Sequence, residues 1–361
     1  MARRRKKSHG GLWFLLLIAL IAGGVGIYYA FPGMFRAEPG PEEALAHQPT
    51  GETENAGEGT SNGTPAKADS NGNSAKNPKG KLPTTAPAQP SAKLSAPMAT
   101  NAFNEGLKLQ SEGKLVAART LLSQALVSGH LNSRQAKQSR EALQDLAERT
   151  IFSKRVYPDD PYCFEYRVKP GEILAGKKGI IRRMNLRIPY QTILEINRIG
   201  ADRSIQAGQK IKLVRGPFHA VVDKSDCLMD IYLHDIFIQR IPVGIGKRDT
   251  PTPVGFFRIG WGKRERAPYT PPISSGKPMQ KILPGQEGYP FEPGGRWIPL
   301  EGIEAAGTDV RESDGYGIHG TNEPESIGKP SSLGCVRLSD AGIAEVFKLL
   351  YVQHSTVQIK E

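Results

Sequence analysis

A histidine and a cysteine, His319 and Cys335, lie in one segment near the C-terminus that is rich in glycine, proline and small polar residues. A cysteine attacks a carbonyl as the thiolate, and because a free thiol has a pKa of about 8.5 it needs a neighbouring base. His319 is the natural base, and Gly320 after it leaves a carbonyl accessible to orient the imidazole. Gly334 removes a side chain where a reacting carbonyl approaches and exposes backbone N–H groups to an oxyanion. Taken singly, each residue is more often an inert cysteine or an ordinary core or surface histidine.

The residues around this pair form two motifs, Ile318-His319-Gly320-Thr321 and Ser332-Leu333-Gly334-Cys335-Val336-Arg337. Together they resemble the catalytic signature of the L,D-transpeptidase (YkuD-type) family. The likeness extends over about Phe218 to Glu361. It includes Thr252-Pro253-Val254-Gly255-Phe256-Phe257, which is similar to the family's TPxGxF strand entry, and the stretch from Gly294 to Ile298. Leu333 stands where many members carry a second histidine.

By that resemblance Cys335 is the nucleophile and His319 the general base and acid of an acyl transfer. The N–H groups of Gly334 and Cys335 would stabilise the oxyanion. Ser332 and Gly320 would orient the catalytic pair, and Arg337 would hold the loop or a substrate carboxylate. Tyr316 lines the entry or, equally, packs at the surface.

The resemblance implies peptidoglycan stem peptides and glycan strands as partners. The expected reaction is L,D-transpeptidation, which forms cross-links and serves cell-wall biogenesis and cell shape. Two alternatives stay open: a cysteine L,D-carboxypeptidase that transfers the acyl group to water, and a non-catalytic wall-binding scaffold. Nothing in the sequence separates an amine from water as acceptor.

Strand signals dominate residues 216–361, which we expect to form a mostly-β catalytic domain, an L,D-transpeptidase-like β-sandwich. Apolar and polar residues alternate on both sides of His234-Asp235, which predicts a β-hairpin. A short helix is expected around Ala341 to Leu350.

Residues 162–215 resemble the lysin-motif (LysM) glycan-binding module. The likeness rests on Tyr166, Val168, Gly171, Glu172, Leu194, Asn197, Ala207-Gly208-Gln209, Ile211 and Leu213. It implies a small α/β module of βααβ order that binds peptidoglycan, or a spacer of the same fold without a ligand. Before it, residues 99–155 show helical periodicity and predict a helical spacer similar to a tetratricopeptide unit.

The N-terminal part predicts attachment to a membrane. Residues 1–10 contain a block of Arg and Lys, and residues 11–31 are uncharged and apolar over a length that spans a bilayer. We therefore expect an uncleaved single-pass anchor in the cytoplasmic membrane, with the C-terminal domains in the periplasm or extracytoplasmic space. Residues 32–98 are polar and small, which predicts a disordered linker.

The excess of 48 Lys and Arg over 36 Asp and Glu gives a net charge of +12. Five of the positive charges lie in the N-terminal block and the remaining basic charge is spread along the chain, so we expect no nucleic-acid partner. No metal-ligand spacing or phosphate loop stands out, so no metal and no cofactor are expected. Of three cysteines, Cys163 and Cys227 are a candidate disulfide whose pairing the sequence cannot establish.

Overall fold

The computed structural model describes residues 94–201, 204–271, 280–292 and 294–361. The predicted basic tail (1–10), the predicted anchor (11–31) and nearly all of the predicted linker (32–98) lie outside the described residues. Within the described ranges, no helix combines the length and the apolar character needed to cross a membrane.

Three helices open the described chain: α2 (Ala96–Ser111), α3 (Leu115–Val127) and α4 (Ser133–Thr150). They occupy the region predicted to be helical, but α2 begins at Ala96, inside the segment predicted to be a linker. Pro97 favours this start, because a proline in the first turn removes an N–H that has no helical partner. At the start of α4, Asn132 and Gln135 form a reciprocal capping box.

A small module follows with the predicted βααβ order. It consists of β1 (Cys163–Arg167), α5 (Ile180–Arg183), α6 (Tyr190–Ile196) and β2 (Lys210–Val214). The two strands pair antiparallel, with Cys163 opposite Val214. Asn197 joins α6 to β2, because its side chain donates to the Lys212 carbonyl and accepts from the Lys212 N–H.

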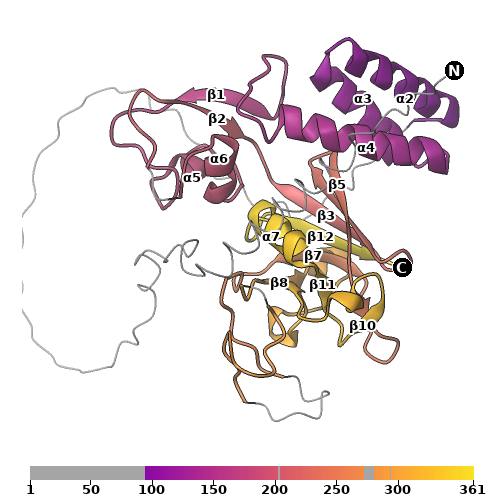
Figure 1. Cartoon of the computed structure of the whole chain (residues 1–361), viewed down its shortest axis with the longest axis vertical. Helices are drawn as coiled ribbons and strands as arrows, with labels where there is room; N and C mark the ends of the chain where they lie inside the picture. The colour runs from indigo at the N-terminus through magenta and orange to yellow at the C-terminus, as the bar shows by residue number, and fades with distance from the viewer. Residues whose placement is uncertain (1–93, 202–203, 272–279, 293) are drawn as a thin grey trace, which may run out of the picture. The chain divides into compact units, whose positions relative to one another are not determined.

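The remaining chain is rich in strands, as predicted (Figure 1). The strands are β3 (Phe218–Asp223), β4 (Leu228–Leu233), β5 (Ile236–Pro242), β6 (Ile245–Gly246), β7 (Gly255–Ile259), β8 (Trp297–Gly302), β9 (Gly317–Gly320), β10 (Pro330–Ser332), β11 (Val336–Leu338) and β12 (Thr356–Lys360). The helix α7 (Asp340–Leu349) confirms the expected C-terminal helix. The predicted hairpin is β4–β5, which turns at His234 with a φ of +54°.

The mostly-β prediction is confirmed, and the strand order shows how the strands are connected. Among the described residues, eight strands form one continuous hydrogen-bonded sheet in the order β11-β9-β8-β7-β12-β3-β4-β5. β12 causes this continuity, because it pairs parallel with β3 on one side and antiparallel with β7 on the other. The C-terminal strand therefore joins two groups of strands that would otherwise be separate sheets. β6 and β10 form a further short parallel pair.

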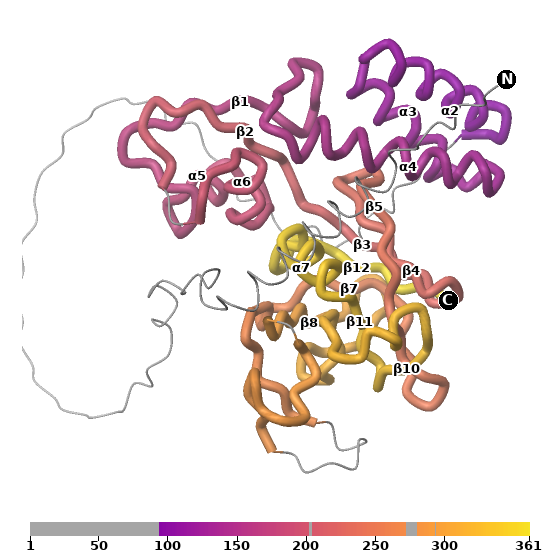
Figure 2. The backbone as a smooth tube through the Cα atoms, in the orientation of Figure 1, coloured from indigo at the N-terminus to yellow at the C-terminus, as the bar shows by residue number. Residues whose placement is uncertain are grey.

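The three helices pack against the β4–β5 hairpin. β5 is the last strand of the sheet, and its Phe237 N–H donates to Ser123 Oγ of α3 at 3.1 Å. Tyr232 and Phe237 share a buried cluster with Leu122, Leu143 and Leu146 of the helices. Figure 2 shows α4 beside β5. The helices therefore cover a sheet edge that would otherwise present unpaired backbone groups.

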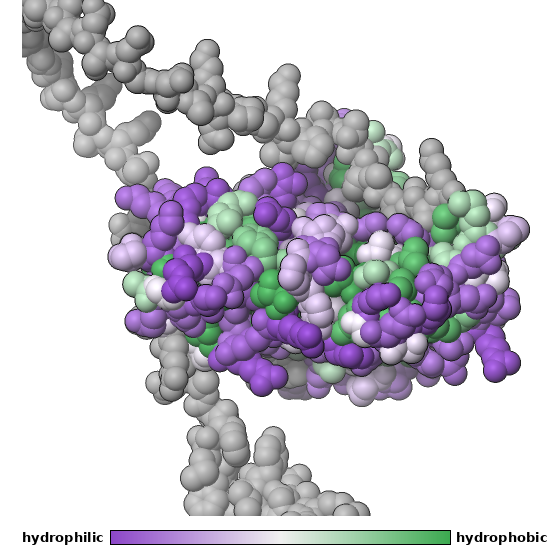
Figure 3. All heavy atoms as spheres, turned by 90° about the horizontal axis from the view of Figure 1, so that it is seen from above, coloured by the Kyte–Doolittle hydropathy of each residue, from purple (hydrophilic) through white to green (hydrophobic). Residues whose placement is uncertain are grey.

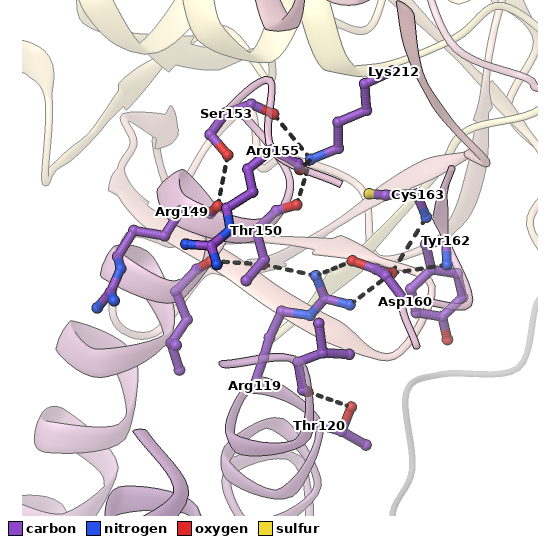
Figure 4. Close-up of polar contacts among 12 residues, drawn as sticks. Arg119, Thr120, Arg149, Thr150, Ser153, Arg155, Asp160, Tyr162, Cys163 and Lys212 are labelled. Carbon is purple, nitrogen blue, oxygen red and sulfur yellow. Dashed lines mark hydrogen bonds and ion pairs between the residues drawn. The ribbon is translucent and has the colours of Figure 1, made fainter. Parts of the chain in front are cut away.

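A buried ion pair ties the helices to the βααβ module (Figure 4). Arg119 of α3 and Asp160 are both fully buried, and the Arg119 guanidinium donates to both carboxylate oxygens at 3.1 Å. Arg119 also donates to Thr150 Oγ1 at 2.8 Å. Asp160 Oδ1 accepts from the Tyr162 N–H at 2.9 Å and from the Cys163 N–H at 3.3 Å, which positions the start of β1.

A second buried cation reinforces this junction. Lys212 of β2 is 2% exposed, and its ammonium donates to three backbone carbonyls at and just after the C-terminus of α4, those of Thr150, Ser153 and Arg155 (Figure 4). Three carbonyls match the three N–H donors of an ammonium group. The charge is therefore solvated by the backbone although burial lowers the pKa of Lys212.

All three cysteines are free thiols, so the Cys163–Cys227 disulfide considered from the sequence is not formed. The two residues belong to different elements, Cys163 to β1 and Cys227 to the turn between β3 and β4. Hydrophilic residues cover most of the face in Figure 3, with apolar residues in small groups between them.

Candidate active site

His319 and Cys335 are carried by neighbouring strands at one end of the large sheet. His319 lies in β9, and Cys335 directly precedes β11. β11 pairs parallel with β9, with Arg337 opposite His319 and Val336 opposite Ile318. Because side chains alternate between the faces of a strand, Cys335 and Arg337 lie on the face that carries His319. The sheet thus brings together the two residues that the sequence singles out.

The His319 side chain is held by its own strand and by aromatic rings. It is 5% exposed, and its Nδ1 bonds to the Gly320 carbonyl, as the sequence predicts. A carbonyl oxygen only accepts, so we infer that Nδ1 carries the proton and that Nε2 is the basic nitrogen. The ring contacts Phe291 and Trp297, with centroid distances of 4.5 and 5.8 Å.

The environment keeps His319 neutral. Burial lowers the pKa of His319 to about 4, because the imidazolium would lose its hydration. The hydrogen bond to the Gly320 carbonyl acts in the opposite direction, and the nearby Arg337 charge lowers the pKa further.

The Cys335 thiol is also neutral in this structure. Burial raises the pKa of Cys335 to about 11, while a backbone hydrogen bond from Gly317 and the charge of Arg337 lower it. The thiol contacts the Gly315 carbonyl oxygen at 3.6 Å. Burial raises the pKa of Cys163 and Cys227 as well. Cys335 is distinguished by its partial exposure and by its histidine, since the other two thiols are buried.

Ser332 shapes the turn that presents Cys335. Its buried hydroxyl donates to the Cys335 carbonyl at 2.6 Å and accepts from the Gly334 N–H at 3.1 Å. The oxyanion role predicted for the Gly334 N–H therefore requires this bond to open. The Cys335 N–H, the second donor predicted from the sequence, follows directly on the same turn.

Gly334 is required by its backbone and by its neighbour. Its φ is +113°, a conformation that residues with a Cβ rarely adopt. A Cβ at this position would lie 2.7 Å from the Cε1 of Tyr316. Tyr316 is half-buried and packs on this turn, next to the Cys335 segment.

Arg337 is fixed from two sides. Its guanidinium forms an ion pair with Glu323, and its backbone N–H and carbonyl pair with Gly244 at 2.8 and 2.9 Å. Within the described residues, Arg337 Nε is buried without a hydrogen-bond partner. Arg337 thus holds the loop between β9 and β11 through Glu323, a residue that the sequence analysis did not single out.

Sequence reasoning also missed the aromatic residues around His319. Phe291 contacts Tyr269, Tyr289 and Trp297 at centroid distances of 5.2, 5.5 and 5.2 Å. The charge of a Cys335 thiolate raises the pKa of Tyr269, after the larger effect of burial, which places Tyr269 near the thiol. In the sequence, the concentration of aromatic residues between Tyr289 and Trp297 could have indicated this aromatic cluster.

Comparisons with known proteins agree with this assignment of elements. The L,D-transpeptidase catalytic domain (YkuD) family model matches residues 217–359, and the LysM domain model matches residues 166–214. The Bacillus subtilis protein YqjB, provisionally named an L,D-transpeptidase, is 35% identical over 138 residues, which cover 38% of this chain and 68% of YqjB. The Bacillus licheniformis protein YkuD, named in the same way, is 28% identical over 191 residues, covering 51% of this chain and 92% of that protein.

Among solved structures, the NMR structure of the catalytic domain from the E. faecium L,D-transpeptidase is similar to this chain. The two chains are 21% identical, and the match covers 39% of this chain and 95% of the E. faecium domain with a TM-score of 0.28.

Proposed function

Because the chain belongs to the L,D-transpeptidase family, we propose that it cross-links peptidoglycan stem peptides by acyl transfer through Cys335. The observation that supports this best is the parallel pairing of β9 and β11, which brings Cys335 to the sheet face of His319. A partly exposed thiol and a neutral imidazole with a basic Nε2, on one face of paired strands, are suited to nucleophilic catalysis.

The proposed reaction begins as Cys335 Sγ attacks the carbonyl of the bond between an L-centre and a D-residue of a stem peptide. His319 Nε2 takes the thiol proton as the sulfur–carbon bond forms, and the Cys335 N–H stabilises the oxyanion. The imidazolium then protonates the leaving D-amino acid, and a thioester remains on Cys335. An amine of a second stem, such as the side-chain amine of a diaminoacid, attacks the thioester, forms the new amide and regenerates the thiol.

The βααβ module would hold the glycan strand near the catalytic domain. Linking two binding sites raises the effective concentration of stem peptides at the second site. We also propose that residues 11–31 anchor the protein in the cytoplasmic membrane with these domains outside. The basis is the apolar stretch and the positive block before it.

Mass spectrometry of muropeptides incubated with the purified full-length chain tests the proposal. We expect cross-linked dimers, absent with Cys335→Ala and retained with Cys227→Ala, which changes the buried thiol in the turn between β3 and β4. Trimmed monomers would identify a carboxypeptidase, and unchanged muropeptides would favour a scaffold. A carbapenem probe should add its mass to Cys335, and an adduct on Cys163 or Cys227 alone would contradict the nucleophile.

A further inference from the structure

A cleft lies between helix α4 and strand β5. Its volume is about 400 Å³, and it is lined by Lys137, Arg140, Glu141, Gln144, Phe237 and Arg240. The lining residues belong to α4 and β5, and none of them is a residue of the catalytic pair.

The cations of this cleft differ in how their charges are satisfied. Arg240 forms a bidentate ion pair with Asp230, at 2.6 and 2.8 Å. Lys137 is 4.0 Å from Glu141 on the exposed side of α4. Arg140 forms no ion pair or hydrogen bond with any residue in the described part of the chain, and its Nε is buried without a partner. The cleft therefore contains one half-buried guanidinium whose Nε–H has no acceptor among the described residues.

This arrangement is unfavourable without a ligand. Burial lowers the pKa of Arg140, and the charge of Arg240 lowers it further, while Asp230 and, less strongly, Asp226 act in the opposite direction. The half-buried guanidinium of Arg140 lies near the like charge of Arg240, and the carboxylate of Asp230 is already bound by Arg240. The described residues of the cleft supply no two-oxygen acceptor to Arg140. Such an acceptor, for example a carboxylate, is the group that a guanidinium fork binds best.

We propose that the α4–β5 cleft binds the carboxylate of a peptide, with Arg140 as its principal ligand. Gln144 offers an amide that can pair with the peptide backbone. Phe237 forms an apolar part of the wall, where a small aliphatic side chain can pack.

The charges of the cleft favour a peptide over a polyanion such as a phosphodiester polymer. Arg240 and Lys137 are each matched by a carboxylate, and Glu141 at the rim repels a second negative group. One unmatched cation fits the single charge of a terminal carboxylate. This site is independent of the proposed acyl transfer, since it uses no residue of the catalytic pair.

NMR of the full-length chain with ¹⁵N-labelled arginine tests the proposal directly. The Nε–H signal of Arg140 is followed during titration with N-acetyl-Ala-Ala, with the same dipeptide as its C-terminal amide, and with inorganic phosphate. We expect saturable binding of the free acid in the millimolar range. The amide should bind about tenfold more weakly or worse, because it lacks the charge-assisted hydrogen bonds.

Two variants complete the experiment. Arg140→Gln should weaken binding of the free acid at least tenfold and leave the circular dichroism spectrum unchanged, because no internal bond is lost. Arg134→Gln, an exposed arginine of the same helix, should bind as the wild type does. Equal binding of acid and amide, tighter binding of phosphate than of the acid, or an unaffected Arg140→Gln variant would each overturn the proposal. So would an Arg140 signal that does not move in the wild-type chain.

Discussion

The buried pair of Arg119 and Asp160 offers a quantitative test of how the helices and the βααβ module are held together. Replacing Arg119 by Met keeps most of the side-chain volume but removes both hydrogen bonds to the carboxylate. Asp160 is then left as a fully buried charge whose remaining donors are the N–H groups of Tyr162 and Cys163. Thr150 keeps its bond to the Leu146 carbonyl, so the carboxylate bears the main loss.

Breaking a buried ion pair by removing one partner costs about 3–5 kcal/mol. We expect the lower end of this range for Arg119→Met, because two backbone donors still solvate Asp160. For a folded unit of this size, a loss of about 3 kcal/mol lowers the melting temperature by about 6–12 °C. Adding Asp160→Asn should restore part of the stability, since asparagine keeps an acceptor oxygen for the two N–H groups and removes the unpaired charge.

Urea denaturation followed by circular dichroism measures these differences in the free energy of unfolding. Arg149→Met is the matched control, because Arg149 pairs with Asp145 on the exposed side of α4 at 3.1 Å. An exposed pair of this kind is worth at most about 0.5 kcal/mol. The reasoning would be refuted by equal losses for Arg119→Met and Arg149→Met, or by a double variant as unstable as the sum of the two single ones.

Two further predictions concern the sheet and the active-site turn. His219 accepts a hydrogen bond from the Thr356 N–H, and burial lowers its pKa to about 4 from about 6.5. The free energy of unfolding should therefore fall by up to about 3 kcal/mol as the pH drops from about 6.5 to about 4, because the unfolded chain binds the proton first. His219→Asn should flatten this part of the pH profile in urea titrations. An unchanged slope in the variant would contradict the prediction. Gly334→Ala should lower the cross-linking rate by more than about tenfold, because the added Cβ strains the backbone and meets Tyr316. Gly328→Ala is the control. Gly328 also has a positive φ but has open space around it, so this change should have little effect on the rate.

The sequence was sufficient to predict many of the local elements, because these depend on short-range patterns. Alternating residues around His234 predicted the β4–β5 hairpin, and Gly334 before Cys335 was expected to expose the backbone, where it has a positive φ. Long-range pairing was not predictable in this way. That β12 bonds to both β3 and β7 depends on where the chain end returns in space, and no local pattern encodes it.

The buried charges were missed for a related reason. Arg119 lies in a helix whose periodic apolar residues predicted its buried face, and a lone arginine in such a pattern is normally expected at the surface. Its partner Asp160 follows in a loop after the next helix. Only the packing of α3 and α4 against the βααβ module reveals that both are fully buried and paired.

The pKa values of the catalytic pair bear on the order of events in the proposed reaction. With the pKa of Cys335 raised to about 11 and that of His319 lowered to about 4, the resting pair is a thiol and a neutral imidazole. Arg337 favours a thiolate but disfavours an imidazolium, so its charge does not stabilise a preformed ion pair. Proton transfer must therefore accompany attack on the carbonyl. The same low pKa makes the imidazolium, once formed, a strong acid, which then protonates the leaving amine readily.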